Sequence, residues 1–151
     1  MKNFYLITLF MCLSNLQAWA MGSSEKAVYD LIERVTPGYV SQYRLEIIPS
    51  ENGNDVYEVD GDGQKIILRG NNAVSLATAF NWYLKYTCHA HVSWFGSQLE
   101  LPAKLPQPAH KERRIINGKY RVYMNYCTVS YTAAWWNWER WQQELDYMAM
   151  N

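Results

Sequence analysis

Two residues near the carboxyl end of the chain have side chains suited to polar recognition. Asn125 and Cys127 lie two positions apart within residues 121–128. If this segment is a β-strand, its alternation places both side chains on one face, together with Tyr123. An amide both donates and accepts hydrogen bonds, and a thiol is weakly polar. The pair therefore fits either the wall of a binding site at a strand end or an ordinary inward-facing layer of a barrel.

Other side chains that could take part in chemistry have simpler explanations. Glu139 and Glu144 are carboxylates, but we expect both on the solvated face of a helix, where Arg140 and Glu144 are spaced to form an i, i+4 ion pair. Residues 88–91 read Cys-His-Ala-His, whereas a zinc site needs three or four ligands and the sequence offers no further matching cluster. We therefore predict no metal and no cofactor.

The predicted strand is followed by a helical pattern. From about Trp135, apolar residues recur at steps of three and four and form one stripe, made of Trp138, Trp141, Leu145 and Met148. A strand followed directly by a helix is the first half of a βαβ unit, which needs a further parallel strand. We therefore expect residues 115–151 to be the first strand and helix of a (β/α)8 barrel in a longer protein, truncated after one unit.

The residues before this unit predict a small domain of packed layers. Caps and periodicity indicate two helices, at Ser23–Val35 and from Asn71 or Asn72 to about Tyr86. Apolar runs indicate strands at 43–47, 56–59, 65–68 and 92–95. The fold class is thus α/β (α+β), with a mostly antiparallel sheet and two helices over residues 21–101. Three prolines followed by a basic cluster predict an extended linker over residues 102–114.

The composition is that of a folded protein, and the first residues predict export. Of 151 residues, 49% are hydrophobic, and 14 basic residues balance 14 acidic ones, which argues against nucleic acid as a partner. Residues 1–20 are typical of a signal peptide, with Lys2, a short apolar run and a small-x-small site at 18–20. We expect a periplasmic or secreted protein (lysosomal in a eukaryote) with no membrane association after cleavage. Cys88 and Cys127 could then form a disulfide.

Three motifs at the end of the chain carry a family resemblance. The sequence contains N-x-C-T-x-S-Y from Asn125, W-W-x-W-x-R-W from Trp135 and E-x-D-x-M-A-x-N from Glu144. Upstream, residues 68–102 read LRGNNAVSLATAFNWYLKYTCHAHVSWFGSQLELP. Together these stretches resemble the α-N-acetylglucosaminidases, family 89 of the glycoside hydrolases. The resemblance is specific from about residue 68 to the end of the chain.

The resemblance implies a retaining hydrolase that releases terminal α-linked N-acetylglucosamine from glycosaminoglycan or related glycans. It implies two catalytic glutamates on later barrel strands, to which no residue of this chain corresponds, so we expect these residues to be inactive alone. It assigns Asn125 and Cys127 to contacts with the terminal N-acetylglucosamine. The alternative is a non-catalytic α/β interaction or carbohydrate-adjacent module. The sequence gives no signal for the oligomeric state.

Overall fold

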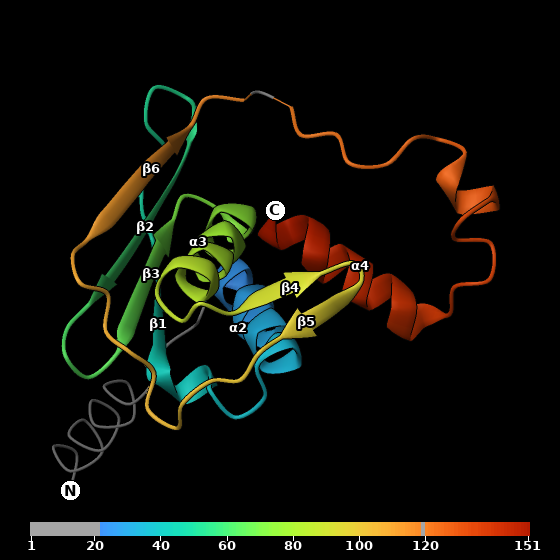
Figure 1. Ribbon diagram of the computed structural model, residues 1–151. Helices are drawn as coiled ribbons and strands as arrows, with labels where there is room; N and C mark the ends of the chain where they lie inside the picture. Colours follow the sequence, from blue (N-terminus) through green and yellow to red (C-terminus); the bar gives the residue numbers. More distant parts are fainter. Residues whose placement is uncertain (1–21, 119) are drawn as a thin grey trace, which may run out of the picture.

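The computed structural model describes residues 22–118 and 120–151, and the predicted signal peptide, residues 1–20, lies outside them (Figure 1). In chain order the elements are α2 (Ser23–Val35), η1 (Val40–Gln42), β1 (Tyr43–Ile47), β2 (Asp55–Gly61), β3 (Ile66–Gly70), α3 (Ala73–Tyr86), β4 (His91–Ser93), β5 (Gly96–Gln98), β6 (Glu112–Ile116), η2 (Thr128–Ser130) and α4 (Trp138–Met150). None of the described helices combines the length and the hydrophobicity that crossing a bilayer requires.

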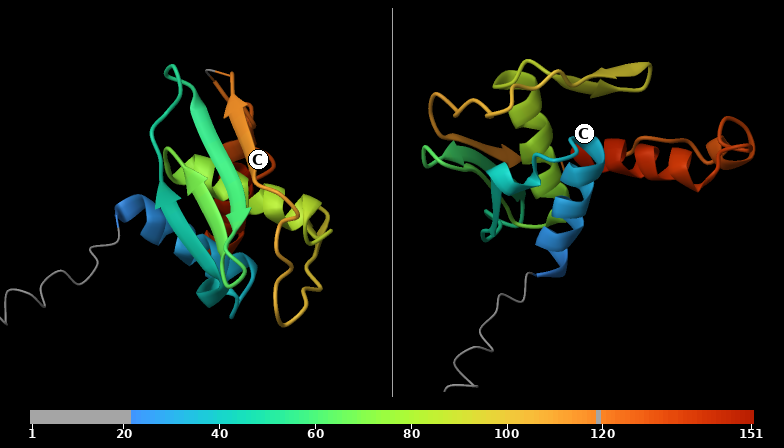
Figure 2. Two further views of the ribbon diagram at one scale, coloured as in Figure 1. Left: turned by 90° about the vertical axis from the view of Figure 1, so that its left-hand side faces the viewer. Right: turned by 90° about the horizontal axis from the view of Figure 1, so that it is seen from below.

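A four-stranded sheet forms the base of the N-terminal part. Its strand order is β1-β3-β2-β6, with β2 antiparallel to both neighbours and β1 parallel to β3, so the predicted mostly antiparallel sheet is confirmed. The helices lie together on one face of this sheet (Figure 2). The other face carries charged side chains that pair with one another, because Glu46 accepts from both Arg44 and Arg69.

The core lies between the sheet and helix α3. Leu76, Phe80, Tyr83 and Leu84 of this helix have no exposed surface. Tyr43 of β1 meets the rings of Phe80 and Tyr83 edge-on, at centroid distances of 5.6 and 5.8 Å. Edge-to-face pairs of this kind contribute about 0.5–1.5 kcal/mol each beyond the area that they bury. Helix α3 is therefore the element around which the N-terminal part packs.

Helix α3 begins where the sequence predicts. The side chain of Asn72 caps it by accepting a backbone N–H of the first turn at 2.9 Å. Asn71 ties this turn to β2, because its Oδ1 accepts from the backbone nitrogen of Val56 at 2.8 Å. Gly70 permits the close approach, since a Cβ atom there would lie 2.6 Å from the backbone nitrogen of Leu76. The helix is thus fixed against the end of β3.

The predicted linker ends in a strand. Residues 102–111 have no regular secondary structure, but Glu112–Ile116 form β6 and pair with β2 at the edge of the sheet. This pairing explains the basic cluster, because Lys111 and Arg113 contact the carboxylate of Glu58 on β2. The extended linker is therefore replaced by a strand over its last residues. Strand β6 pairs with β2, which lies far away in the sequence, so the residues around β6 carry no local pattern that predicts the strand.

Residues 121–128 do not form the predicted strand. Residues 120–125 have no regular secondary structure, and the 3-10 helix η2 follows shortly after them. In the described part of the chain no segment pairs with them in a sheet. A strand needs neighbours that satisfy its backbone N–H and C=O groups, so an alternating pattern alone does not hold it. The strand prediction is wrong for this structure for that reason.

Helix α4 is present, but it buries a different face from the one predicted. It begins at Trp138 rather than at about Trp135. Trp138 and Leu145 of the predicted stripe are 63% and 47% exposed, whereas Glu144 is fully buried and Met150 is 1% exposed. Met150 joins the core beside α3, and the buried acidic residue has polar partners on other elements. Contacts with distant residues, and not the apolar pattern alone, therefore set how α4 is turned.

A polar contact fixes the carboxyl end of α4 on α3. Asn81 Nδ2 donates to the backbone carbonyl of Met150 at 2.9 Å and to the side-chain oxygen of Asn151 at 3.0 Å. Figure 1 shows the result: after β6 the chain runs far from the sheet over residues 120–137 and returns as α4 to end beside α3. The last helix is thus seated on the N-terminal part, while the segment before it extends away.

Candidate functional site

The two residues predicted to contact sugar lie in one tight turn. Asn125 Oδ1 accepts hydrogen bonds from the backbone nitrogen of Cys127 at 2.9 Å and from Thr128 Oγ1 at 3.3 Å. The side chains of Asn125 and Cys127 are exposed. The disulfide left open by the sequence is not formed, because the thiols of Cys88 and Cys127 are free. We call residues 125–130 the Asn125 turn, and its role in sugar binding stays a prediction.

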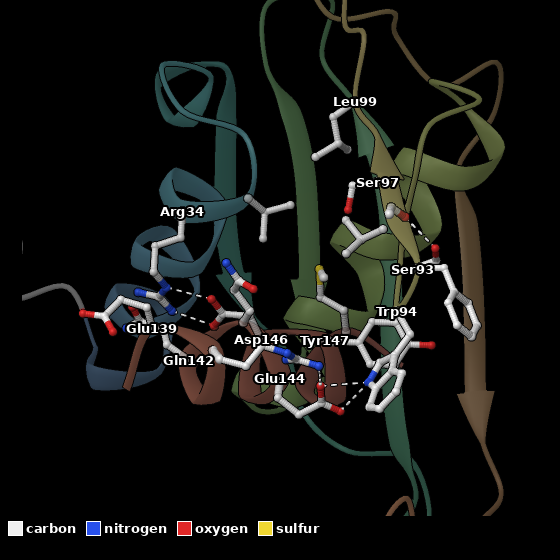
Figure 3. Close-up of a pocket in the computed structure, with 17 residues that line it drawn as sticks. Arg34, Ser93, Trp94, Ser97, Leu99, Glu139, Gln142, Glu144, Asp146 and Tyr147 are labelled. Atoms are coloured by element: carbon white, nitrogen blue, oxygen red, sulfur yellow. Dashed lines mark hydrogen bonds and ion pairs between the residues drawn. The ribbon is translucent and has the colours of Figure 1, made fainter. Parts of the chain in front are cut away.

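A groove lies elsewhere, between α4, the β4–β5 hairpin and the end of α2 (Figure 3). It measures about 680 Å³. Its polar lining includes Arg34, Glu139, Arg140, Glu144 and Asp146, and its apolar lining includes Val92, Trp94, Phe95, Leu99 and Met150. Neither Asn125 nor Cys127 lines this groove. The groove and the Asn125 turn are therefore separate places on the molecule.

Glu144 is the buried centre of one wall of the groove. Its side chain is 1% exposed, and Arg140 Nη2 contacts its Oε2 at 2.7 Å, which confirms the predicted i, i+4 pair. Trp94 Nε1 donates to both carboxylate oxygens, at 3.0 and 2.8 Å. The predicted solvated position is therefore wrong for Glu144, because α4 turns it toward the hairpin, where an indole N–H and a guanidinium replace water. Glu139 is exposed, as predicted.

These contacts set the charge of Glu144. Burial favours the neutral acid, but hydrogen bonds with Trp94, Arg140 and Tyr123 outweigh burial and lower the pKa of the Glu144 carboxyl below its ordinary value. The group is therefore ionised at neutral pH, with its oxygens engaged by donors. A general acid must carry a proton that it can give to a substrate. Glu144 is thus suited to holding α4 on the hairpin and not to proton transfer.

Aromatic rings surround the guanidinium that pairs with Glu144. The Arg140 guanidinium carbon lies 4.0 Å from the ring centroid of Trp136 and 5.4 Å from that of Trp94. The centroids of these two indoles are 6.1 Å apart, and Trp136 also packs against Trp141 at 5.0 Å. Cation–π contacts of this kind contribute about 0.5–2 kcal/mol. We call Trp94, Trp136, Arg140 and Glu144 the Glu144 cluster.

A second ion pair joins α4 to α2 (Figure 3). Arg34, in the last turn of α2, donates from Nε and Nη2 to the two carboxylate oxygens of Asp146, each at 2.7 Å. This hydrogen bonding raises the pKa of Arg34 despite the opposing effect of burial. Two parallel bonds fix orientation as well as distance. Helix α4 is therefore held to α2 through Asp146 and to the β4–β5 hairpin through Glu144.

Sequence reasoning finds only the local part of this arrangement. The pair of Arg140 and Glu144 follows from helical spacing, whereas Trp94 and Arg34 lie 50 and 112 residues from their partners on α4. No pattern within one element points to contacts of that separation. Of the residues that the structure describes, no three His, Cys, Asp or Glu side chains gather as metal ligands would. Within the described residues, the groove is thus held together by hydrogen bonds and aromatic contacts and offers no set of metal ligands.

The two parts of the chain match two neighbouring domains of one protein family. Residues 26–107 match the family description "Alpha-N-acetylglucosaminidase (NAGLU) N-terminal domain", and residues 121–151 match "Alpha-N-acetylglucosaminidase (NAGLU) tim-barrel domain". The chain belongs to the alpha-N-acetylglucosaminidase family. The human member named Alpha-N-acetylglucosaminidase is 36% identical over 130 residues, which cover 83% of this chain and 18% of the human protein.

Solved structures of the alpha-N-acetylglucosaminidase family share this fold. A family 89 glycoside hydrolase from Clostridium perfringens is similar with a TM-score of 0.80 and 34% identity, over 84% of this chain and 15% of that one. It has been solved in complex with 2-acetamido-1,2-dideoxynojirmycin, and a variant in complex with its substrate GlcNAc-alpha-1,4-galactose. The chain therefore spans less than a fifth of the length of these relatives.

The groove falls at the junction between the two alpha-N-acetylglucosaminidase domains. Arg34 and Trp94 belong to the part that matches the N-terminal domain, and Glu144 and Asp146 belong to the part that matches the barrel domain. Both sets of hydrogen bonds across the groove therefore connect one domain to the other. The Asn125 turn lies wholly in the barrel part.

Proposed function

We propose that this chain is the N-terminal portion of an exported alpha-N-acetylglucosaminidase. The enzyme is a retaining glycoside hydrolase that releases terminal α-linked N-acetylglucosamine from glycosaminoglycan or related glycans. The observation that carries the proposal is the succession of the two family domains along the chain, supported by the identity to the human protein. The substrate bound to the Clostridium perfringens relative supports a terminal N-acetylglucosamine as the ligand.

Retaining hydrolysis requires chemistry that the two glutamates of α4 do not supply. One carboxylic acid protonates the glycosidic oxygen and a second carboxylate, about 5–5.5 Å away, attacks the anomeric carbon. Glu144 is ionised and occupied by its partners, and Glu139 is exposed on the helix. We assign both catalytic groups to barrel strands that these residues do not include. The contribution of this chain is sugar binding, with an amide and a thiol presented by the Asn125 turn.

Hydrolysis of a chromogenic α-N-acetylglucosaminide tests the proposal. We expect turnover by the full gene product, including any residues encoded after Asn151, and none by residues 21–151 alone. Nuclear magnetic resonance of the first product should show the α-anomer, because a double displacement retains configuration. The Clostridium perfringens enzyme serves as the positive control. A full gene product that leaves the substrate intact under the control conditions would overturn the proposal.

The exported location is a separate part of the proposal. It rests on the charged start, apolar run and small-x-small site of residues 1–20. Mass spectrometry of the protein recovered from its native cells should find a mature amino terminus at Met21. An intact protein that still begins at Met1 would contradict export through this segment.

A further inference from the structure

We propose that Trp94, at the tip of the β4–β5 hairpin, is a positioning residue for the Asn125 turn. This inference rests on the proposed function, because it concerns the residues assigned there to sugar binding. Trp94 belongs to the N-terminal domain by its family match, and the Asn125 turn belongs to the barrel domain. The N-terminal domain would then help to set the geometry of the sugar contacts, through the Glu144 cluster.

The chain just before the Asn125 turn is fixed to this cluster. Burial and the nearby carboxylate of Glu144 raise the pKa of Tyr123, two residues before Asn125, to about 12. Its ring also packs edge-on against Tyr147 of α4, at a centroid distance of 5.8 Å. A single residue separates Tyr123 from the turn, so the position of Tyr123 limits where Asn125 can lie.

The chain just after the Asn125 turn is fixed to the same cluster. Trp136 lies over the guanidinium of Arg140 and beside the indole of Trp94. The backbone between is also bonded, since Trp136 N donates to the carbonyl of Ala133 at 3.1 Å and Ala133 N donates to that of Thr128 at 2.8 Å. The Asn125 turn thus lies between Tyr123, which packs on α4 beside Glu144, and Trp136, which is itself a member of the Glu144 cluster.

Trp94 is the member of the cluster that comes from outside the barrel part. Its Nε1–H bonds both oxygens of Glu144, and its ring contacts Trp136 and Arg140. Trp94→Phe removes the N–H while keeping an aromatic ring against these neighbours. Tyr86 provides a control in the same domain, because Tyr86→Phe also removes a donor from an aromatic ring, and Tyr86 is 64% exposed at the end of α3, outside the groove and the Glu144 cluster.

Kinetics of the full gene product test the inference through a double-mutant cycle. We expect Trp94→Phe to lower kcat/KM by roughly tenfold, mainly through KM, because a hydrogen bond to a charged group is lost. Tyr86→Phe should leave kcat/KM unchanged. In the Asn125→Ala background the further loss from Trp94→Phe should largely disappear, since Trp94 acts through the turn. Losses that multiply, or equal effects of Trp94→Phe and Tyr86→Phe, would overturn the inference.

The Cys127 thiol supplies a readout that needs no turnover. In the full gene product, where the proposed sugar site surrounds the thiol, we expect Trp94→Phe to raise the rate of Cys127 alkylation by iodoacetamide severalfold, as read by peptide mass spectrometry. Cys88 is the internal reference, because it is part-buried and packs against the N-terminal core. Faster alkylation of both thiols would indicate general loosening and overturn the inference. If the wild type hydrolyses nothing, the proposed function fails, and the Cys127 rates still decide whether Trp94 fixes the turn.

Discussion

Two carboxylates on α4, Glu144 and Asp146, are buried, although acidic side chains are mostly exposed in folded proteins. Each meets donors from another element: Trp94 bonds Glu144, and Arg34 bonds Asp146 through two parallel bonds. A buried carboxylate without such partners would be destabilising, and its pKa would rise. The partners instead keep Glu144 ionised. Glu144 therefore joins the two domains because of the donors around it, and not simply because it is a glutamate.

Glu144→Gln isolates the charge of this residue at nearly constant size. We expect the free energy of unfolding to fall by about 1–3 kcal/mol, because hydrogen bonds to a buried charged group are weakened. Urea denaturation followed by tryptophan fluorescence measures this loss. Glu139→Gln, an exposed position on the same helix, should change the free energy by less than about 0.5 kcal/mol. Equal losses for both variants would show that the buried contacts of Glu144 stabilise the fold no more than an exposed glutamate does.

Asn125 and Cys127 can be tested as sugar contacts in the full gene product. We expect Asn125→Ala to raise KM for the chromogenic substrate by roughly tenfold, because sugar hydroxyls lose an amide partner. Cys127→Ala should have a smaller effect, of about twofold to fivefold, since it removes a small and weakly polar group. Val129→Ala is the control, because Val129 is 62% exposed in the same turn. A KM that is equal in all three variants would argue against the assignment.

At the scale of elements, the sequence predicts what local signals determine. Helix α2 has the predicted bounds, Ser23–Val35, because residues within and next to the helix determine its apolar face and its end before Pro37-Gly38. The cap of α3 at Asn72 is equally local. Residues 121–128 alternate as a strand does, yet they form none, since pairing depends on segments elsewhere. The buried face of α4 fails for the same reason, because the partner of Glu144 is Trp94.

Met150 tests the seating of α4 on the core. Met150→Ala removes a side chain that is 1% exposed, and we expect a loss of about 2–5 kcal/mol in the free energy of unfolding. Met148, which is only part-buried on the same helix, gives the control, and Met148→Ala should cost clearly less. Thermal denaturation of both variants makes the comparison. A Met150→Ala variant as stable as the control would mean that α4 does not close the core.

Limited digestion with chymotrypsin tests the segment that runs away from the sheet. We expect the first cuts within residues 120–137, where Tyr126 and Trp135 are 93% and 95% exposed. Cuts within α3 should come much later, because Tyr83 has no exposed surface. Mass spectrometry of the fragments over time locates each cut. Early cleavage of α3, at the rate seen in residues 120–137, would contradict this difference in packing.

For the whole molecule, acid should loosen both the sheet and the domain junction. Hydrogen bonds with Lys111 and Arg113 outweigh burial and lower the pKa of Glu58. Hydrogen bonds with Trp94 and Arg140 likewise lower the pKa of Glu144. Each folded-state pKa lies below the unfolded one, so the ionised forms stabilise the fold above the ordinary pKa of about 4.3. That contribution is lost as the pH falls through the ordinary value toward the lower folded one.

Thermal denaturation across pH 3 to 7 measures this dependence. We expect the midpoint to fall below about pH 4.5 in the wild type. Glu58→Gln and Glu144→Gln together should lower the midpoint at pH 7 and flatten the acid limb, because two protonation steps are removed. An unchanged slope in the double variant would show that other carboxylates control the acid transition.

Strand β6 has a practical consequence for dividing the chain. The first family match stops at residue 107 and the second begins at residue 121, so a cut at the end of the first discards β6. The remaining piece would expose β2 as an unpaired edge strand, open to pairing with another copy, and Glu58 would lose Lys111 and Arg113 while keeping Arg69. Severing the polypeptide after residue 118 instead keeps that edge covered.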